Sequence, residues 1–328
     1  MADHIGIIIP AYKPDFFFEA LQSIEKQTDK RFQVYIGDDA SPHDLWSIAR
    51  EFVERNGWIY HRFDENLGAQ NLVAHWNRCV EISTEHWIWL FSDDDKMSPD
   101  CVETFFSEKE KSPDHQVFKF PYAMIDQQGN VTGIQEIHQE KYSGFEFGKL
   151  RFQRKILSAA VEFIFSRQSW QSESGFVPFP AAWCSDDASW IAFSGLPGIR
   201  ALPSGRVFWR LSEVNISSRS GIYIDQKLQA ASDFILWFNE RFRLLPERKS
   251  LLGEQIIWFR LQIEQLNYEI PLFKALMFSL KLGRGALPSL LRIFNELYFR
   301  SFTSMLDKKG EDFSCLWKWK ISRFLPRF

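Results

Sequence analysis

The sequence predicts an α/β chain in which a mostly parallel sheet flanked by helices occupies residues 1–224 and a helical region occupies residues 225–328. In the first hundred residues, short apolar runs bounded by turn residues alternate with stretches of helical periodicity, which is typical of a parallel sheet. Two of these apolar runs end in acidic loops. From Asp225 onward, only helical periodicity remains.

Each element is predicted from its own pattern. Four β-branched or aromatic runs are expected to form the first strands of the sheet: Ile5–Ile9, Phe32–Ile36, Trp58–Phe63 and Trp87–Phe91. Apolar residues at helical spacing predict two helices among them: Asp15–Gln27 and Ala69–Ile82. Two later runs are expected to be strands joined by a turn: Val117–Ile125 and Val131–Ile137. Three long helical patterns separated by prolines end the chain: Lys227–Phe242, Leu251–Tyr268 and Leu287–Phe302.

With 328 residues, 45% hydrophobic and 25% charged, the chain is large enough for one big α/β domain plus a smaller appendage. Its four cysteines show neither metal-ligand spacing nor a disulfide framework, which favours a reducing compartment. The first apolar run is too short for a signal peptide, and no run reaches the ~20 apolar residues of a spanning helix. We therefore expect a cytoplasmic protein.

Charge is distributed unevenly along the chain. From Phe273 to the end there are 11 basic and 4 acidic residues, whereas the part before it has 28 basic and 38 acidic residues. Near the end, aromatic residues alternate with Lys and Arg, as in Trp317–Lys320. This pattern predicts peripheral docking on an anionic membrane surface, with a buried helical lid or an oligomer interface as the alternative. Nucleic acid is not an expected partner, because the body is acidic.

Three consecutive carboxylates, Asp93–Asp95, follow the fourth predicted strand. Like charges at a strand end resist burial unless a cation neutralises them, and oxygen ligands without Cys or His suit Mg²⁺ or Mn²⁺. A solvated acidic turn before the helix that begins near Pro99 is the alternative. Because ligands of a parallel sheet lie beyond the carboxyl ends of its strands, Tyr12, Asp38 and Asp39 are expected to gather with these carboxylates on one rim.

Four motifs, in this order, resemble those of the family 2 glycosyltransferases. They are Ile-Ile-Ile-Pro-Ala-Tyr-Lys ending at Lys13, Asp-Asp-Ala-Ser at 38–41, Glu-Asn-Leu-Gly at 65–68, and an Asp-x-Asp at 93–95. The resemblance covers about Ile5 to Ser218. It implies a GT-A fold with a donor half near residues 1–100 and an acceptor half near 101–224. It also implies a nucleotide-diphosphate sugar donor, a divalent metal (Mn or Mg) and inversion at the anomeric carbon.

The resemblance assigns nucleotide-sugar contacts and metal ligands. The residues matching the donor site are Pro10, Ala11, Tyr12, Asp38, Asp39, Asn66, Gly68, Asp93, Asp94 and Arg210. Within this set, Tyr12 and Asp39 match the groups that hold the base, and Asn66 matches a turn that is otherwise an ordinary helix start. Asp93 and Asp95 match the metal-binding pair, with Asp94 able to take either role.

The resemblance also assigns the catalytic base, which takes the proton of the acceptor hydroxyl. Asp186 and Asp187 stand where the family has Glu-Asp before an aromatic helix. Matching acid to acid assigns the base to Asp187, whereas an ungapped match on Trp190 assigns it to Asp186; a helix N-cap is the alternative. The family's histidine after Arg210 is Ser212 here, which leaves metal coordination to Asp95, phosphates and water.

These observations predict an inverting hexosyltransferase. Its donor is of the UDP type, and its acceptor is a glycan or lipid-linked molecule in bacterial surface polysaccharide synthesis. A Mg²⁺-dependent nucleotidyltransferase or phosphotransferase is the alternative enzyme, because it uses the same acidic cluster. A non-catalytic sugar-nucleotide-binding scaffold is a third reading; it would keep Asp39 and Asp95 but would not need Asp186 or Asp187.

Overall fold

A computed structural model describes residues 3–136, 139–211, 223–266, 268, 270–283 and 293–300. The chain divides into two compact units, Met1–Arg219 and Ser220–Phe328. Ser212, which replaces the histidine of the family, lies outside the described residues. So does the segment from Asp312 to Phe328, the end of the basic stretch that is predicted to dock on a membrane.

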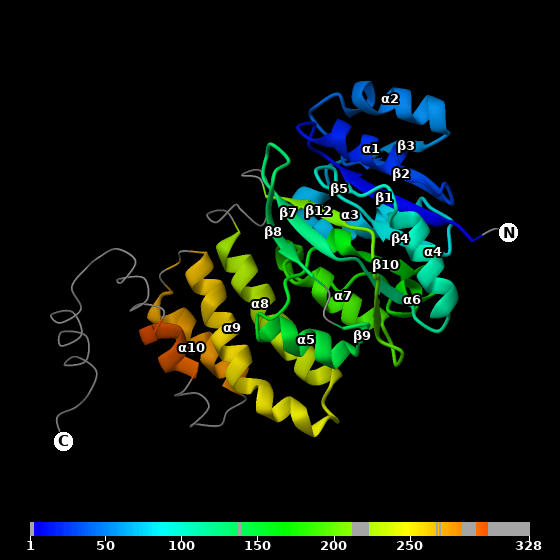
Figure 1. Ribbon diagram of the computed structural model, residues 1–328. Coiled ribbons are helices and arrows are strands. Elements are labelled where there is room, and N and C mark those ends of the chain that lie inside the picture. The colour runs from blue at the N-terminus through cyan, green and yellow to red at the C-terminus, as the bar shows by residue number, and fades with distance from the viewer. Residues whose placement is uncertain are drawn as a thin grey trace, which may run out of the picture. The chain divides into compact units, whose positions relative to one another are not determined.

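The first unit is built on an eight-stranded sheet with the order β3-β2-β1-β4-β10-β6-β11-β9 (Figure 1). Its first four strands are parallel and correspond to the four predicted runs: β1 Ile5–Ala11, β2 Phe32–Asp38, β3 Ile59–Arg62 and β4 Trp87–Leu90. The other four strands complete the sheet: β6 Val117–Lys119, β9 Lys141–Tyr142, β10 Phe163–Ser166 and β11 Ile199–Ala201. Because β1 has parallel partners on both sides, the carboxyl ends of β1, β2 and β4 lie on the same edge.

Helices and short 3₁₀ turns connect these strands. The helices are α1 Phe17–Glu25, α2 Leu45–Asn56, α3 Gly68–Glu81, α4 Cys101–Lys111, α5 Gly144–Phe152, α6 Arg167–Ser172 and α7 Ser185–Phe193. The 3₁₀ turns are η1 Ala160–Glu162 and η2 Pro180–Ala182. Aromatic side chains fill the core, where Trp89 stacks on Phe120 at 4.8 Å and donates its indole N–H to the Val161 carbonyl.

A second, four-stranded sheet corrects one prediction. It consists of β5 Lys96–Met97, β12 Val207–Arg210, β7 Tyr122–Ile125 and β8 Val131–Gln135. The predicted single strand Val117–Ile125 is therefore two strands, β6 and β7, that belong to different sheets. Pro121 lies at the break and has no N–H to continue a ladder, although its carbonyl accepts from Val207.

The second unit is helical. It contains α8 Ile224–Arg241, the 3₁₀ turn η3 Pro246–Leu251, α9 Leu252–Gln265, α10 Leu272–Gly283 and the π-helical turn η4 Asn295–Arg300. The first two predicted helices are present, whereas α10 was not predicted because Pro271 reads as a helix breaker; proline is in fact compatible with a helix start. The predicted helix Leu287–Phe302 lies partly outside the described residues. Among the helices that the structure describes, none is long and apolar enough to cross a membrane.

Candidate active site

The predicted rim forms where the loop after β1 meets the end of β4. One carboxylate oxygen of Asp93 accepts hydrogen bonds from the backbone N–H groups of Tyr12 and Lys13, each at 2.8 Å. The hydroxyl of Ser41, which follows β2, donates to the Tyr12 carbonyl at 2.7 Å. Hydrogen bonds therefore connect the loops after three parallel strands. Tyr12 keeps 39% of its surface exposed, so its ring can receive a ligand.

The acidic triplet is buried and has one ammonium group in contact with it. The Nζ of Lys13 lies 2.5 Å from Asp94 and 3.6 Å from Asp93. Burial lowers the pKa of Lys13, but the charges of Asp93 and Asp94 outweigh it and keep that pKa above its usual value. Burial also raises the pKa of Asp93 to about 6, against the opposing charge of Lys13. The triplet is thus a counter-charged cluster and not a solvated turn.

Asp95 lies against the last residue of β12. Its Oδ1 accepts from the backbone N–H of Arg210 at 2.7 Å, and burial, followed by the neighbouring charge of Asp94, raises the pKa of Asp95 well above its usual range. The guanidinium of Arg210 is fully buried. It donates to backbone carbonyls, including that of Asp94, and pairs with Glu19 at 2.9 Å. The sequence leaves two roles open for Arg210, contact with the diphosphate or anchoring of the loop, and this geometry favours anchoring.

The carboxylates fit a divalent cation that shares its ligands with a substrate. Asp93–Asp95 bring three buried carboxylates together and the Lys13 ammonium compensates only part of their charge. Within the described residues, no three acidic, histidine or cysteine side chains converge into a complete metal cage. One or two of these carboxylates could hold Mg²⁺ or Mn²⁺ only together with oxygens of a bound phosphate.

Asp39 faces the start of α3. Its two oxygens accept from the backbone N–H groups of Leu67 and Gly68, both at 2.9 Å, and it pairs with Arg78. Burial raises the pKa of Asp39, against the hydrogen bonds from Gly68 and Leu67 and the charge of Arg78. A carboxylate has about four acceptor positions, so these three contacts leave capacity for a ligand N–H.

The other predicted donor residues mostly hold this frame together. Asp38 is fully buried and accepts from the Tyr60 hydroxyl and the Arg62 guanidinium. Asn66, one residue before the N-cap Leu67, accepts from the Ala69 N–H at 2.9 Å and so holds the first turn of α3. A Cβ at Gly68 would stand 2.5 Å from the Asp39 carboxylate, so the small residue is needed there for Asp39. The remaining two, Pro10 and Ala11, end strand β1 instead of forming the predicted loop.

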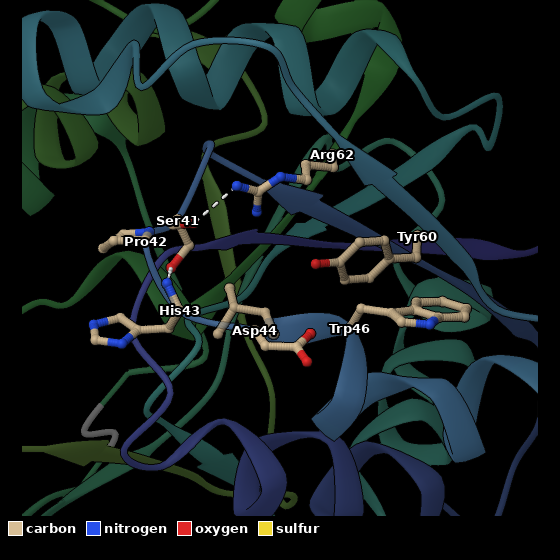
Figure 2. A pocket seen from close by; sticks show the side chains of 8 residues that line it. Ser41, Pro42, His43, Asp44, Trp46, Tyr60 and Arg62 are labelled. Atoms are coloured by element: carbon tan, nitrogen blue, oxygen red, sulfur yellow. Dashed lines mark hydrogen bonds between the residues drawn. The ribbon is translucent and has the colours of Figure 1, made fainter.

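A hollow of about 470 Å³ lies beside the rim, between the loop after β2 and strand β3 (Figure 2). Trp46 and Tyr60 meet there edge to face with 5.2 Å between ring centroids, and Arg62 donates to the Ser41 carbonyl. None of the residues predicted to bind the donor lines this hollow. It therefore adds no argument for the donor site.

Asp187 is held by an arginine that sequence reasoning did not identify. Arg151, on α5, donates to both carboxylate oxygens of Asp187 through Nε and Nη2, at 2.8 to 3.0 Å. Burial lowers the pKa of Arg151, but the charge of Asp187 and its hydrogen bonds outweigh burial and keep this pKa above its usual value. This bidentate pair engages both oxygens of the carboxylate, so Asp187 is less free than an unpaired carboxylate to accept a hydrogen bond from an acceptor hydroxyl.

Asp186, one residue earlier in the first turn of α7, has a different environment. It is half-buried, and it has no ion pair among the residues that the structure describes. Burial first, and then the charge of Asp187, raise the pKa of Asp186 to about 7. A carboxyl group that titrates near neutral pH is matched to general base catalysis.

The loop before α7 has an unusual backbone. Ala181, Ala182 and Cys184 all have positive φ, between 54° and 62°, a region that residues with a Cβ seldom occupy. Such strain persists only where the surrounding structure holds it, and it concentrates at functional sites. Here it immediately precedes the two aspartates.

Three functional candidates were missed by the sequence reasoning: Lys13, Arg78 and Arg151. Lys13 carried a signal, because it directly follows the Pro-Ala-Tyr motif. Arg78 and Arg151 carried none, because each contacts an aspartate more than 30 residues away in the chain.

Comparisons with known proteins identify the family of this chain and the structures that its fold resembles. The model of the family described as "Glycosyl transferase family 2" matches residues 6–170. Glycosyltransferase GlyG of Streptococcus pneumoniae serotype 4 is 22% identical in a match 166 residues long that covers 46% of this chain. The chain spans about half the length of this curated relative, 54%.

Among solved structures, S. aureus TarS 1–349 in complex with UDP-GlcNAc superposes with a TM-score of 0.60 at 12% identity, over 94% of this chain and 93% of that one. The mannosyltransferase PcManGT from Pyrobaculum calidifontis, in complex with GDP-Man and Mn²⁺, gives a TM-score of 0.54 at 14% identity, over 92% and 83%. These likenesses confirm the predicted GT-A type fold.

Proposed function

Because this chain belongs to family 2 of the glycosyl transferases, we propose that it is an inverting hexosyltransferase that uses a nucleotide-diphosphate sugar. Membership of this family favours sugar transfer over nucleotidyl or phosphoryl transfer by the same acidic cluster. The observation that carries the proposal is the meeting of Tyr12, Asp39 and Asp93–Asp95 at one edge of the parallel sheet, where ligands of such sheets bind.

The donor is held by groups from all three strand ends. The exposed ring of Tyr12 offers a face on which the base stacks, and Asp39 accepts from a base N–H with its remaining capacity. Asp95, with Asp93, would hold a divalent ion, which when bound would supply positive charge beside the leaving diphosphate. Lys13 is the counter-charge that keeps Asp93 and Asp94 together.

Asp186 is the catalytic base of this proposal. It takes the proton of the acceptor hydroxyl while the hydroxyl oxygen forms a bond to the anomeric carbon. The bond between this carbon and the diphosphate breaks, and the configuration of the anomeric carbon inverts. Asp187 and Arg151 position the first turn of α7 through their bidentate pair. The pKa near 7 and the lack of an ion pair among the described residues favour Asp186 over Asp187, the residue that matching acid to acid would select.

The finer identity of the reaction is part of the same proposal. The TarS complex with UDP-GlcNAc supports a UDP-type donor, and the PcManGT complex with Mn²⁺ supports manganese or magnesium as the metal. The acceptor is a glycan or a lipid-linked molecule of surface polysaccharide synthesis. The basic stretch that begins at Phe273 places the enzyme peripherally on an anionic membrane, where such an acceptor lies.

The test is a panel of nucleotide sugars, scored by thermal stabilisation with and without Mn²⁺ and followed by calorimetry on the preferred donor. We expect Asp95→Ala to abolish the metal-dependent part of nucleoside-diphosphate binding. Asp39→Ala should weaken binding with or without metal, because its role lies at the base. Equal affinities for the wild type and Asp95→Ala would refute the metal assignment, and stabilisation by no nucleotide sugar would refute the function.

A further inference from the structure

Helix α10 of the second unit presents a face of large apolar side chains to solvent. Four of these residues have the i, i+3, i+4 and i+7 spacing of one helical face: Phe273, Leu276, Met277 and Leu280. Together with the neighbouring Leu272 they form what we call the α10 face. Phe273 is 69% exposed and Met277 is 53% exposed. The residues buried within the unit, Ala275, Ser279 and Leu282, lie elsewhere on the helix. Within the part of this unit that the structure describes, the core therefore does not account for the α10 face.

The charges on and after this helix indicate what covers the face. The helix has two lysines and no acidic residue, and both lysines pair with α8: Lys274 with Asp225, and Lys281 with Asp233 at 2.6 Å. After Gly283 the sequence has nine basic and four acidic residues. An apolar helical face that leads into a basic segment matches an anionic bilayer, whose acyl boundary takes apolar groups and whose phosphates attract cations.

The length of α10 and the basic residues that follow it limit how the α10 face can be covered. Twelve residues at about 1.5 Å each give a helix of roughly 18 Å, shorter than the ~30 Å hydrocarbon core, so α10 could bind a bilayer only by lying in its plane and not by crossing it. Pairing of the same face in a second copy of the chain would bring two basic segments together, which charge repulsion opposes.

We propose that the α10 face docks the protein on an anionic lipid surface, with Phe273 and Met277 entering the acyl boundary. This inference deepens the membrane part of the proposed function, since it names the apolar element that the basic stretch requires. It does not depend on donor binding or on the catalytic base.

The experiment measures flotation of the full chain with vesicles of phosphatidylglycerol and phosphatidylcholine, and with vesicles of phosphatidylcholine alone. We expect the wild type to float with the anionic vesicles only. Phe273→Ser combined with Met277→Ser should lower the bound fraction at least tenfold. The matched control is Leu196→Ser combined with Val131→Ser, two exposed apolar residues of the first unit, and it should bind as the wild type does.

Each other outcome overturns a stated part of the inference. Wild-type flotation by the Phe273 and Met277 variant would refute the α10 face while leaving membrane docking intact. No flotation of the wild type would refute docking itself. A wild-type dimer that becomes monomeric in the variant, without vesicle binding, would make the face an interface between two copies. Donor affinity, measured in parallel, should be the same in every variant, so failure here is separate from failure of the transferase proposal.

Discussion

Replacement of Asp187 by asparagine distinguishes the two candidate bases by the pH dependence of the reaction. If Asp186 is the base, kcat/KM of the wild type rises with pH as this residue loses its proton, with a midpoint near its pKa of about 7. Asp187→Asn removes the negative charge beside Asp186 and leaves the charge of Arg151 uncompensated. Loss of the Asp187 charge, with the Arg151 charge still present, favours the ionised form of Asp186. The midpoint of the pH profile must therefore move to lower pH.

The size of the shift follows from the charges involved. A unit charge a few ångströms away is worth about 2 to 4 kcal/mol at an effective dielectric constant of about 20, which corresponds to roughly 1.5 to 3 pKa units. Burial is the larger cause of the raised pKa of Asp186 and the charge of Asp187 is the second, so the shift on removing that charge should lie below this range. We therefore expect the midpoint to fall by about one unit, with a loss of plateau rate of about tenfold or less.

The assay is the pH profile of kcat/KM with saturating metal, for the wild type, Asp187→Asn and Arg151→Gln. Arg151→Gln is the matched control, because loss of the positive charge should move the midpoint in the opposite direction. Melting curves identify any variant that does not fold. A rate that falls a hundredfold to ten-thousandfold at every pH in Asp187→Asn, with no shift of the midpoint, would make Asp187 the base and refute this reasoning.

Two further predictions concern Asp186 and Lys13. Asp186→Asn should lower the rate of sugar transfer a hundredfold or more. It should also stabilise the protein at pH 8 by about 1 kcal/mol, because the ionised Asp186 is unfavourable in the folded state. Since the pKa of Asp186 is raised in the folded protein, the stability associated with its protonated form is full below pH 4 and is lost as the pH rises through about 7. Chemical denaturation at pH 5 and pH 8 checks this, and an equal effect at both values contradicts it. Lys13→Met should raise the affinity for Mn²⁺ alone by about tenfold, because the ammonium and the metal compete for Asp93 and Asp94. Calorimetry measures it, with unchanged or weaker binding as the contrary result.

The sequence determined the first four strands of the first unit and the edge at which its functional groups meet. Short apolar runs bounded by turn residues, such as Ile5–Ile9 and Trp87–Phe91, indicate buried strands, and alternation with helices indicates that those strands are parallel. Parallel strands place their carboxyl ends on one side, so Tyr12, Asp39 and Asp93 had to meet although they lie far apart in the chain. Local pattern was sufficient there because the rule depends only on strand direction.

The tertiary structure alone decided which of two adjacent aspartates is paired. Asp186 and Asp187 are chemically identical and consecutive, but successive residues of a helix point about 100° apart, so only one of them meets Arg151. The same is true of Pro121, which separates two sheets, and of α10, whose apolar face is recognised only once the buried residues of its unit are known. Each of these features depends on partners distant in the chain, and local sequence does not specify such partners.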